Sequence, residues 1–140
     1  MINSMFGIAR SGIEAESRSV EMAAANIAHM NDTIRPANAS TGAKRKSGSD
    51  SDAYRPGQIA RSAQKDGGVR AQPVEKDPPH ELSFALSDAN ADEAGLMARP
   101  SLAVENEFVY MMMARRSLHA NLTSVRTADA MMGALLNAKI

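Results

Sequence analysis

Residues 2–30 read INSMFGIARSGIEAESRSVEMAAANIAHM and contain no proline. Alternate steps of four and three residues from Ile2 meet an apolar side chain at eight of nine positions, with Glu16 as the exception. Apolar residues at this spacing share one face of a helix, as they do in coiled coils. Glu14 and Arg18 stand four residues apart on the opposite face, where they can pair. The polar residues 31–33, followed by a proline at 36, are typical of a helix end, so we predict an N-terminal helix over residues 1–30.

The C-terminal stretch repeats this pattern. The same steps from Val104 to Leu136 meet an apolar residue at eight of ten positions, interrupted by Arg115 and Asp129. Pro100-Ser101 is typical of a helix start with Ser101 as the N-cap, so we predict a second helix over residues 101–140. Alanines beside both stripes favour close approach of the two helices. We expect a coiled-coil-like pair, and because one antiparallel pair cannot bury two faces of each helix, the second face needs other subunits.

The middle of the chain, residues 31–100, differs in composition. Residues 31–52 are almost entirely polar, with Ile34 as the one large apolar side chain, which indicates a loop or a disordered insertion at 38–52. Residues 69–72 and 82–86 alternate apolar and polar side chains as half-buried strands do, so we predict a small β-hairpin. The fold class is therefore mainly α, with two long terminal helices around a small β-hairpin or irregular middle segment.

Composition excludes several classes of protein. The 140 residues carry 16 basic and 16 acidic side chains, whereas a dedicated nucleic-acid binder shows a basic excess. Ile, Val, Leu and Phe together supply 24 residues, few for a self-sufficient globular enzyme. Cysteine is absent, which excludes disulfides and thiolate chemistry. No apolar stretch is long enough to cross a membrane, and the N-terminus lacks the basic region of a secretory signal peptide.

No catalytic constellation emerges from the polar residues. His29, His80 and His119 lack the spacing of a metal or catalytic site, and Gly67-Gly68 is typical of a turn rather than a phosphate cradle. The remaining candidates have simpler explanations as solvated loops or adaptable helix packing: Lys44-Arg45-Lys46, Asp88, Asp92 and Glu93, and the methionine runs 111–113 and 131–132. We therefore predict no enzyme activity, cofactor, metal or small-molecule substrate.

Both ends of the chain carry recognisable motifs. Residues 23–31, AAANIAHMN, resemble the signature that closes the first helix of flagellar rod, hook and hook-associated proteins. Residues 107–121, EFVYMMMARRSLHAN, resemble the C-terminal motif of the same proteins, and TADAMM at 127–132 continues it. The short length and the middle segments AYRP, GGVRA, DPP and DEAGL are similar to the proximal branch of the flagellar basal-body rod protein family.

The resemblance implies a structural subunit of the basal-body rod, the shaft that transmits motor torque toward the hook. It implies export by the flagellar type III apparatus and a periplasmic place in a helical tube, lined by the terminal helices, with residues 31–100 facing outward. The implied partners are copies of the chain and other rod proteins, with the MS-ring/rod adaptor below and distal rod subunits above, and no nucleic acid.

We predict that the apolar stripes and motif asparagines form the assembly interface, which comprises Ile13, Val20, Asn26, Ile27, Phe108, Met111, Leu118, Asn121, Leu122, Val125 and Met132. Arg115 and Asp129 either meet opposite charges on a neighbour or lean into solvent. The alternative function is a soluble two-helix adaptor or secretion chaperone that binds partner helices and never polymerises. An enzyme ranks third.

Overall fold

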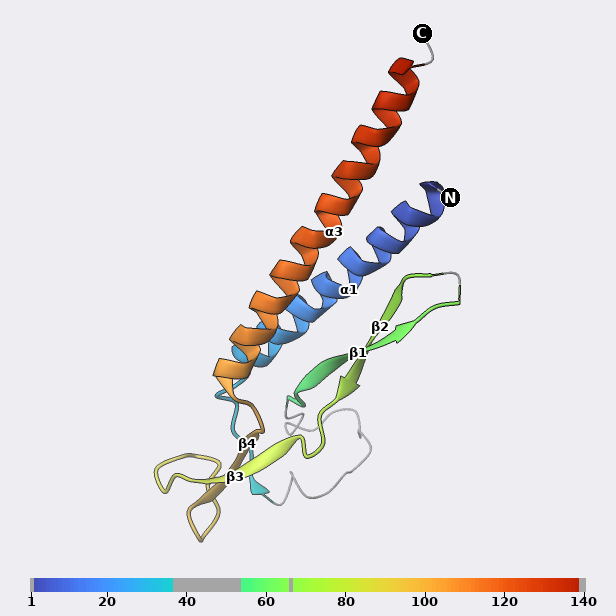
Figure 1. The fold of residues 1–140 in the computed structure, drawn as a ribbon. Coiled ribbons are helices and arrows are strands. Elements are labelled where there is room, and N and C mark those ends of the chain that lie inside the picture. The colour runs from blue at the N-terminus through green and yellow to red at the C-terminus, as the bar shows by residue number, and fades with distance from the viewer. Residues whose placement is uncertain (1, 37–53, 66, 139–140) are drawn as a thin grey trace.

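The computed structural model describes residues 2–36, 54–65 and 67–138 (Figure 1). Its elements are α1 (Ile2–Ala28), β1 (Gly57–Ala63), β2 (Val69–Glu75), β3 (His80–Phe84), β4 (Leu96–Pro100) and α3 (Val104–Ala138). The two helices run antiparallel and pack against each other, and the strands follow beside and below α1. α3 is the longer helix and extends beyond the N-terminal end of α1. The predicted mainly helical fold with two long terminal helices is confirmed.

Alanine dominates the interior of the molecule. Among the described residues, every buried side chain of the Ala, Val, Ile, Leu, Met and Phe types is an alanine: Ala9, Ala15, Ala23, Ala71, Ala98, Ala114 and Ala128. Gly12 extends this pattern on α1, because a methyl group there would lie only 2.6 Å from Nδ2 of Asn121 on α3. The small residues on the helices allow the two backbones to approach closely, as they do at Gly12 beside Asn121. Ala71 and Ala98 lie instead on β2 and β4, and Ala15 borders β2.

The first hairpin covers a second side of α1. β1 and β2 pair antiparallel from Gly57 opposite Glu75 to Ala63 opposite Val69, and both strands contact α1. Gly67 and Gly68 lie in the connecting turn with φ of 82° and 94°, a backbone region that other residues rarely adopt. The predicted turn at these glycines is therefore present.

A second hairpin lies at the end of the molecule away from the chain termini (Figure 1). β3 and β4 pair antiparallel from His80 opposite Pro100 to Phe84 opposite Leu96, and Ile34 forms a bridge with Ala98. The two predicted strands both exist, but they belong to separate sheets. Alternation along the sequence identified the strands without identifying the partner of each.

The second helix begins later than the sequence pattern predicts, at Val104 rather than at Ser101. The Ser101 backbone N–H donates to the Pro79 carbonyl at 3.0 Å, and the Lys76 ammonium donates to the Ser101 carbonyl. Pro100 and Ser101 thus extend the pairing of β3 with β4, and Ala103 accepts the first bonds of the helix. The predicted insertion at 38–52, with Lys44-Arg45-Lys46, lies outside the described residues.

Membrane insertion finds no support in the helices. Within residues 2–36, 54–65 and 67–138, neither helix has the continuous apolar length that a bilayer crossing needs.

The close helix contact predicts that Ala114→Leu destabilises the protein. Ala114 is 2% exposed, and overpacking of a filled site costs about 1–3 kcal/mol. The matched control is Ala120→Leu on the exposed side of the same helix, which we expect to leave the free energy of unfolding nearly unchanged. Urea unfolding followed by circular dichroism measures both. Equal effects of the two substitutions would contradict an alanine-dependent contact at residue 114.

Candidate assembly surfaces

Asn26 joins α1 to the segment that leads into β1. It is 1% exposed, and its Nδ2 donates to the Gly57 carbonyl at 2.9 Å. Its Oδ1 accepts from the Gly57 backbone N–H at 3.2 Å and from the Tyr54 hydroxyl at 2.7 Å. Gly57 packs closely on the helix, because a Cβ there would lie 2.7 Å from Sδ of Met22 and would displace that side chain. One amide side chain therefore fixes the start of the first hairpin on the helix.

Tyr54 is the centre of a wider junction around Asn26. Its ring stacks on His29 with centroids 4.4 Å apart and an interplanar angle of 17°. Its carbonyl lies 3.0 Å from Nε2 of His80 on β3. Burial, together with the negative charge of Glu107 on α3, raises the pKa of the Tyr54 hydroxyl above its ordinary value. Tyr54 thus links the C-terminal end of α1, through Asn26 and His29, to His80 on β3.

The exception in the N-terminal stripe has a structural explanation. Glu16 is 6% exposed, and its Oε2 accepts from Nη2 of Arg61 on β1 at 2.9 Å. The same guanidinium nitrogen donates to Oγ of Ser19 at 3.0 Å. The predicted pair of Glu14 and Arg18 is also present, at 3.0 Å. Glu16 therefore anchors the hairpin instead of interrupting an apolar contact.

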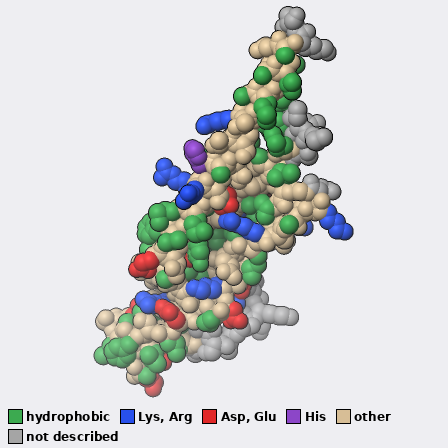
Figure 2. Space-filling view, in the orientation of Figure 1, with side chains coloured by type: hydrophobic (Ala, Val, Ile, Leu, Met, Phe, Trp, Pro, Cys, Tyr) green, Lys and Arg blue, Asp and Glu red, His purple; other side chains and the backbone are tan. Residues whose placement is uncertain are grey.

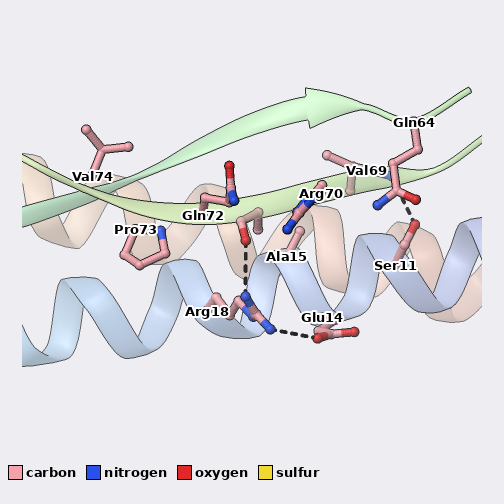
Figure 3. Close-up of a pocket in the computed structure, with 11 residues that line it drawn as sticks. Ser11, Glu14, Ala15, Arg18, Gln64, Val69, Arg70, Gln72, Pro73 and Val74 are labelled. Atoms are coloured by element: carbon pink, nitrogen blue, oxygen red, sulfur yellow. Dashed lines mark hydrogen bonds and ion pairs between the residues drawn. The ribbon is translucent and has the colours of Figure 1, made fainter.

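An open groove of about 600 Å³ separates α1 from β2 (Figure 3). Arg18 lies along the groove. One of its guanidinium nitrogens donates to the Ala71 carbonyl on β2 at 3.1 Å, and another donates to Glu14 on α1. Ser11 Oγ accepts from the Val69 backbone N–H at 3.1 Å and donates to the Ile8 carbonyl at 2.7 Å. These side chains satisfy backbone groups on the free edge of β2, which would otherwise be open to pairing. The Ser11 hydroxyl is already hydrogen-bonded within the chain. The polar side chains of the groove therefore hold β2 against α1 and do not form a reactive site.

Large apolar side chains accumulate on the outside of α3 rather than in its contact with α1 (Figure 2). Near the start of the helix Phe108 is 52% exposed and Met112 is 63% exposed. Near its end Leu135 is 65% exposed and Leu136 is 71% exposed, where α3 extends beyond α1. The other exposed members on this helix are Val109, Tyr110, Met113, Leu122 and Met131. Exposed apolar surface of this kind marks sites of protein association.

The residues predicted to form the assembly interface occupy three environments. Val20, Phe108 and Leu122 are exposed, whereas Asn26 is buried and bonded within the chain. The remaining members are half-buried beside the α1–α3 contact: Ile13, Ile27, Met111, Leu118, Asn121, Val125 and Met132. Ile13 and Ile27 stand four residues after the buried Ala9 and Ala23, so they border the same face.

Several exposed residues did not enter the predicted interface. Val109, Met112, Met113 and Leu135 lie off the 3.5-residue stripe, and only the methionine run drew attention to this side of the helix. Arg115 and Asp129 are exposed, and neither has an ion-pair partner within the part of the chain that the structure describes.

The histidines lie on three different elements. His29 follows α1 and pairs with Asp32 at 2.8 Å, His80 lies on β3, and His119 lies on the exposed side of α3. The described residues contain no group of three or more side chains suited to hold a metal ion.

Comparison with known proteins identifies clear relatives. The chain is 30% identical over 134 residues to the flagellar basal-body rod protein FlgC of Salmonella typhimurium, an alignment that covers 91% of this chain and 90% of the relative. The FlgC protein of Salmonella typhi matches equally well, and that of Yersinia enterocolitica is 29% identical with the same coverage. No protein-family model matches the chain.

The junction predicts that Asn26→Ala destabilises the protein. The substitution removes three hydrogen bonds and leaves buried polar groups of Tyr54 and Gly57 unpaired, which costs about 1–3 kcal/mol. Asn31→Ala is the matched control, because Asn31 is exposed and makes no side-chain hydrogen bond in the described structure. Denaturant unfolding of the two variants and the parent measures the difference. Equal stability of the two variants would contradict the role assigned to Asn26.

The raised pKa of Tyr54 predicts a specific alkaline response. The folded chain keeps the Tyr54 proton to higher pH than the unfolded chain does. The contribution of this protonated hydroxyl to the free energy of unfolding is therefore complete below about pH 10, and it is lost as the pH rises through the raised pKa of the folded state. Tyr54→Phe removes this titration, so its free energy of unfolding should fall less steeply above about pH 10. Tyr110→Phe, at a site 56% exposed, should retain the parent slope. If the free energy of unfolding of both variants falls with pH as steeply as that of the parent, the assignment of this response to Tyr54 is wrong.

Proposed function

Because the chain belongs to the FlgC family of flagellar basal-body rod proteins, we propose that it forms part of the shaft through which the flagellar motor drives the hook. It is a structural subunit of the flagellar basal-body rod. In this role the protein works by transmitting force through its contacts with neighbours. It needs no catalytic centre, cofactor or small-molecule substrate.

The distribution of apolar side chains carries the proposal. Alanines fill the contact between the two helices, while Phe, Leu, Val and Met side chains of α3 stay exposed. Burying one such side chain fully stabilises an association by about 1.5–3 kcal/mol. A chain with this arrangement gains most of its apolar burial from other subunits. Exposed apolar residues at both ends of α3 supply the two different surfaces that a non-closing helical assembly requires.

We infer the cellular context from the family. The chain would reach the periplasm through the flagellar type III export apparatus and take its place among copies of itself and other rod proteins. The adaptor to the MS ring would lie below it and distal rod subunits above. Residues 31–100, which include both hairpins, would face outward from a tube lined by the terminal helices. The exposed members of the predicted interface, Val20, Phe108 and Leu122, would contact neighbouring subunits.

The part of α3 beyond α1 provides the most direct test. Leu135→Asp and Leu136→Asp place a charge on exposed apolar positions without touching the contact with α1. We expect normal export with loss of the subunit from purified basal bodies and loss of swimming, because an assembled interface would have to bury the charge. Asn137→Asp is the matched control, since it adds the same charge at an exposed polar position.

The experiment is done in cells that carry each variant as the only copy of the gene, beside cells that lack it. Normal swimming of the Leu135→Asp and Leu136→Asp cells would contradict assembly through this end of α3. Swimming by cells that lack the gene would contradict the proposed function itself. A chain found only in complex with unassembled partners would favour the adaptor or chaperone alternative.

A further inference from the structure

The free end of the second hairpin carries an exposed apolar and acidic surface. Leu82, Phe84 and Leu86 are 62%, 69% and 73% exposed. Phe84 and Leu86 nevertheless lie across Gly95, where a Cβ would come within 2.8 Å of the Phe84 ring, so their positions are defined by contact. The loop that joins the two strands, residues 85–95, holds three acidic residues and no basic residue. These acidic residues and the three apolar ones form what we call the hairpin end: Leu82, Phe84, Leu86, Asp88, Asp92 and Glu93.

The charges of the hairpin end are not neutralised by ion pairs. Asp88 accepts hydrogen bonds from the Asn90 backbone N–H and the Thr33 hydroxyl, which are both neutral groups. Asp92 accepts from the backbone N–H groups of Ala94 and Leu96. Arg35 borders the loop but forms no ion pair with it in the described structure. The nearby Arg99 is already paired with Glu81 at 2.8 Å. The hairpin end therefore keeps a negative charge beside its apolar surface.

The exposed face of α3 has the opposite charge and the same apolar character. Residues 108–128 contain three arginines and one histidine but no acidic residue. Met112, Arg116 and His119 are three or four residues apart, so they share one exposed face of the helix. Phe108 lies one turn before Met112 on the same face. Arg115 and Arg126 lie beside them, and none of the three arginines has an ion-pair partner in the described residues. We call this set the basic face: Phe108, Val109, Met112, Arg115, Arg116, His119 and Arg126.

The two surfaces lie in different parts of one elongated molecule and are both open to solvent (Figure 2). Each combines three large apolar side chains with at least three charges of one sign, and the signs are opposite. Interfaces combine an apolar centre with a polar rim, and complementary charges select the partner and its register. Neither surface meets its complement inside the chain, although the net charge of the whole chain is zero.

We propose that the hairpin end of one subunit docks on the basic face of α3 in a second copy of the chain. Leu82, Phe84 and Leu86 lie against Phe108, Val109 and Met112, while the acidic loop meets Arg115, Arg116 and Arg126. The contact is heterologous, because two different surfaces meet, and it leaves a linked pair of subunits with one free surface of each kind. The inference rests on the proposed function, since it names the surface by which copies recognise each other in the rod.

Disulfide cross-linking tests the contact directly, because the chain has no cysteine of its own. Ala94 lies in the acidic loop and Ala120 beside the basic face, and both are exposed. We expect oxidation of cells that carry Ala94→Cys with Ala120→Cys to yield linked dimers and larger species. The matched control joins Ala94→Cys with Ala24→Cys, an exposed position on the outer side of α1, and should yield neither. Each single variant should give dimers at most.

Charge reversal tests the electrostatic part. Arg116→Glu should reduce the cross-linked yield by about tenfold, because an attraction becomes a repulsion, and Glu93→Lys in the same chain should restore it. Glu21→Lys on the outer side of α1 adds the same charge outside the contact and should neither reduce nor restore the yield. Equal secreted amounts of all variants show that folding and export are unchanged.

The outcomes separate this contact from the proposed function. Equal cross-linking by the Ala120 and Ala24 pairs, or none in cells that swim normally, would overturn the contact and leave the rod function intact. A failure of Glu93→Lys to restore the Arg116→Glu chain would overturn the proposed pairing of charges. Swimming by cells that lack the gene would remove the premise of a rod subunit altogether.

Discussion

The contact between α1 and α3 through alanine is the constraint on which the rest of the structure depends. Ala9, Ala23, Ala114 and Ala128 let the helices approach closely, but each contributes only a methyl group to the buried surface. At about 0.8 kcal/mol for a buried CH₂-sized group, such a contact defines a geometry more than it provides stability. Larger apolar side chains such as Leu118 and Val125 border this contact only half-buried, and others on α3 are exposed. The chain is therefore built to complete its apolar burial in an assembly.

Hydrogen bonds and ion pairs position the first hairpin on α1, a role that an apolar core has in a larger domain. Asn26 holds Gly57 and Tyr54, Glu16 holds Arg61, and Arg18 holds the edge of β2. Hydrogen bonds of this kind require a defined direction and distance, so they fix the first hairpin in one position on α1. The junction around Tyr54 also brings in His80 of β3 and the charge of Glu107 on α3. In the rod role proposed above, this rigidity would let force pass between the helices and the hairpins.

Sequence periodicity predicted the helices and the strands but not their partners. On α1 the 3.5-residue stripe contains the buried Ala9, Glu16 and Ala23, because α-helical geometry relates spacing to direction. On α3 the buried residues Glu107, Ala114 and Ala128 all lie off the stripe, which runs beside the buried side. The stripe could not show that Glu16 meets Arg61, since that contact joins residues 45 positions apart. Serine is a residue type favoured at N-caps, but the Ser101 backbone continues the pairing of β3 with β4. Asn26 entered the predicted interface through a family motif, whereas in this structure its amide is fully engaged within the chain.

Strength and selectivity come from different side chains at the exposed surfaces. An exposed ion pair contributes about 0–1 kcal/mol, so the arginines of α3 alone cannot hold an assembly together. Burial of Phe108, Met112, Leu135 and similar residues supplies far more, but apolar contacts have little directional preference. A chain with balanced charge gains selectivity only if the charges are segregated locally, as they are between residues 85–95 and 108–128. Segregation of this kind allows one register of neighbouring subunits and opposes the others by like-charge repulsion.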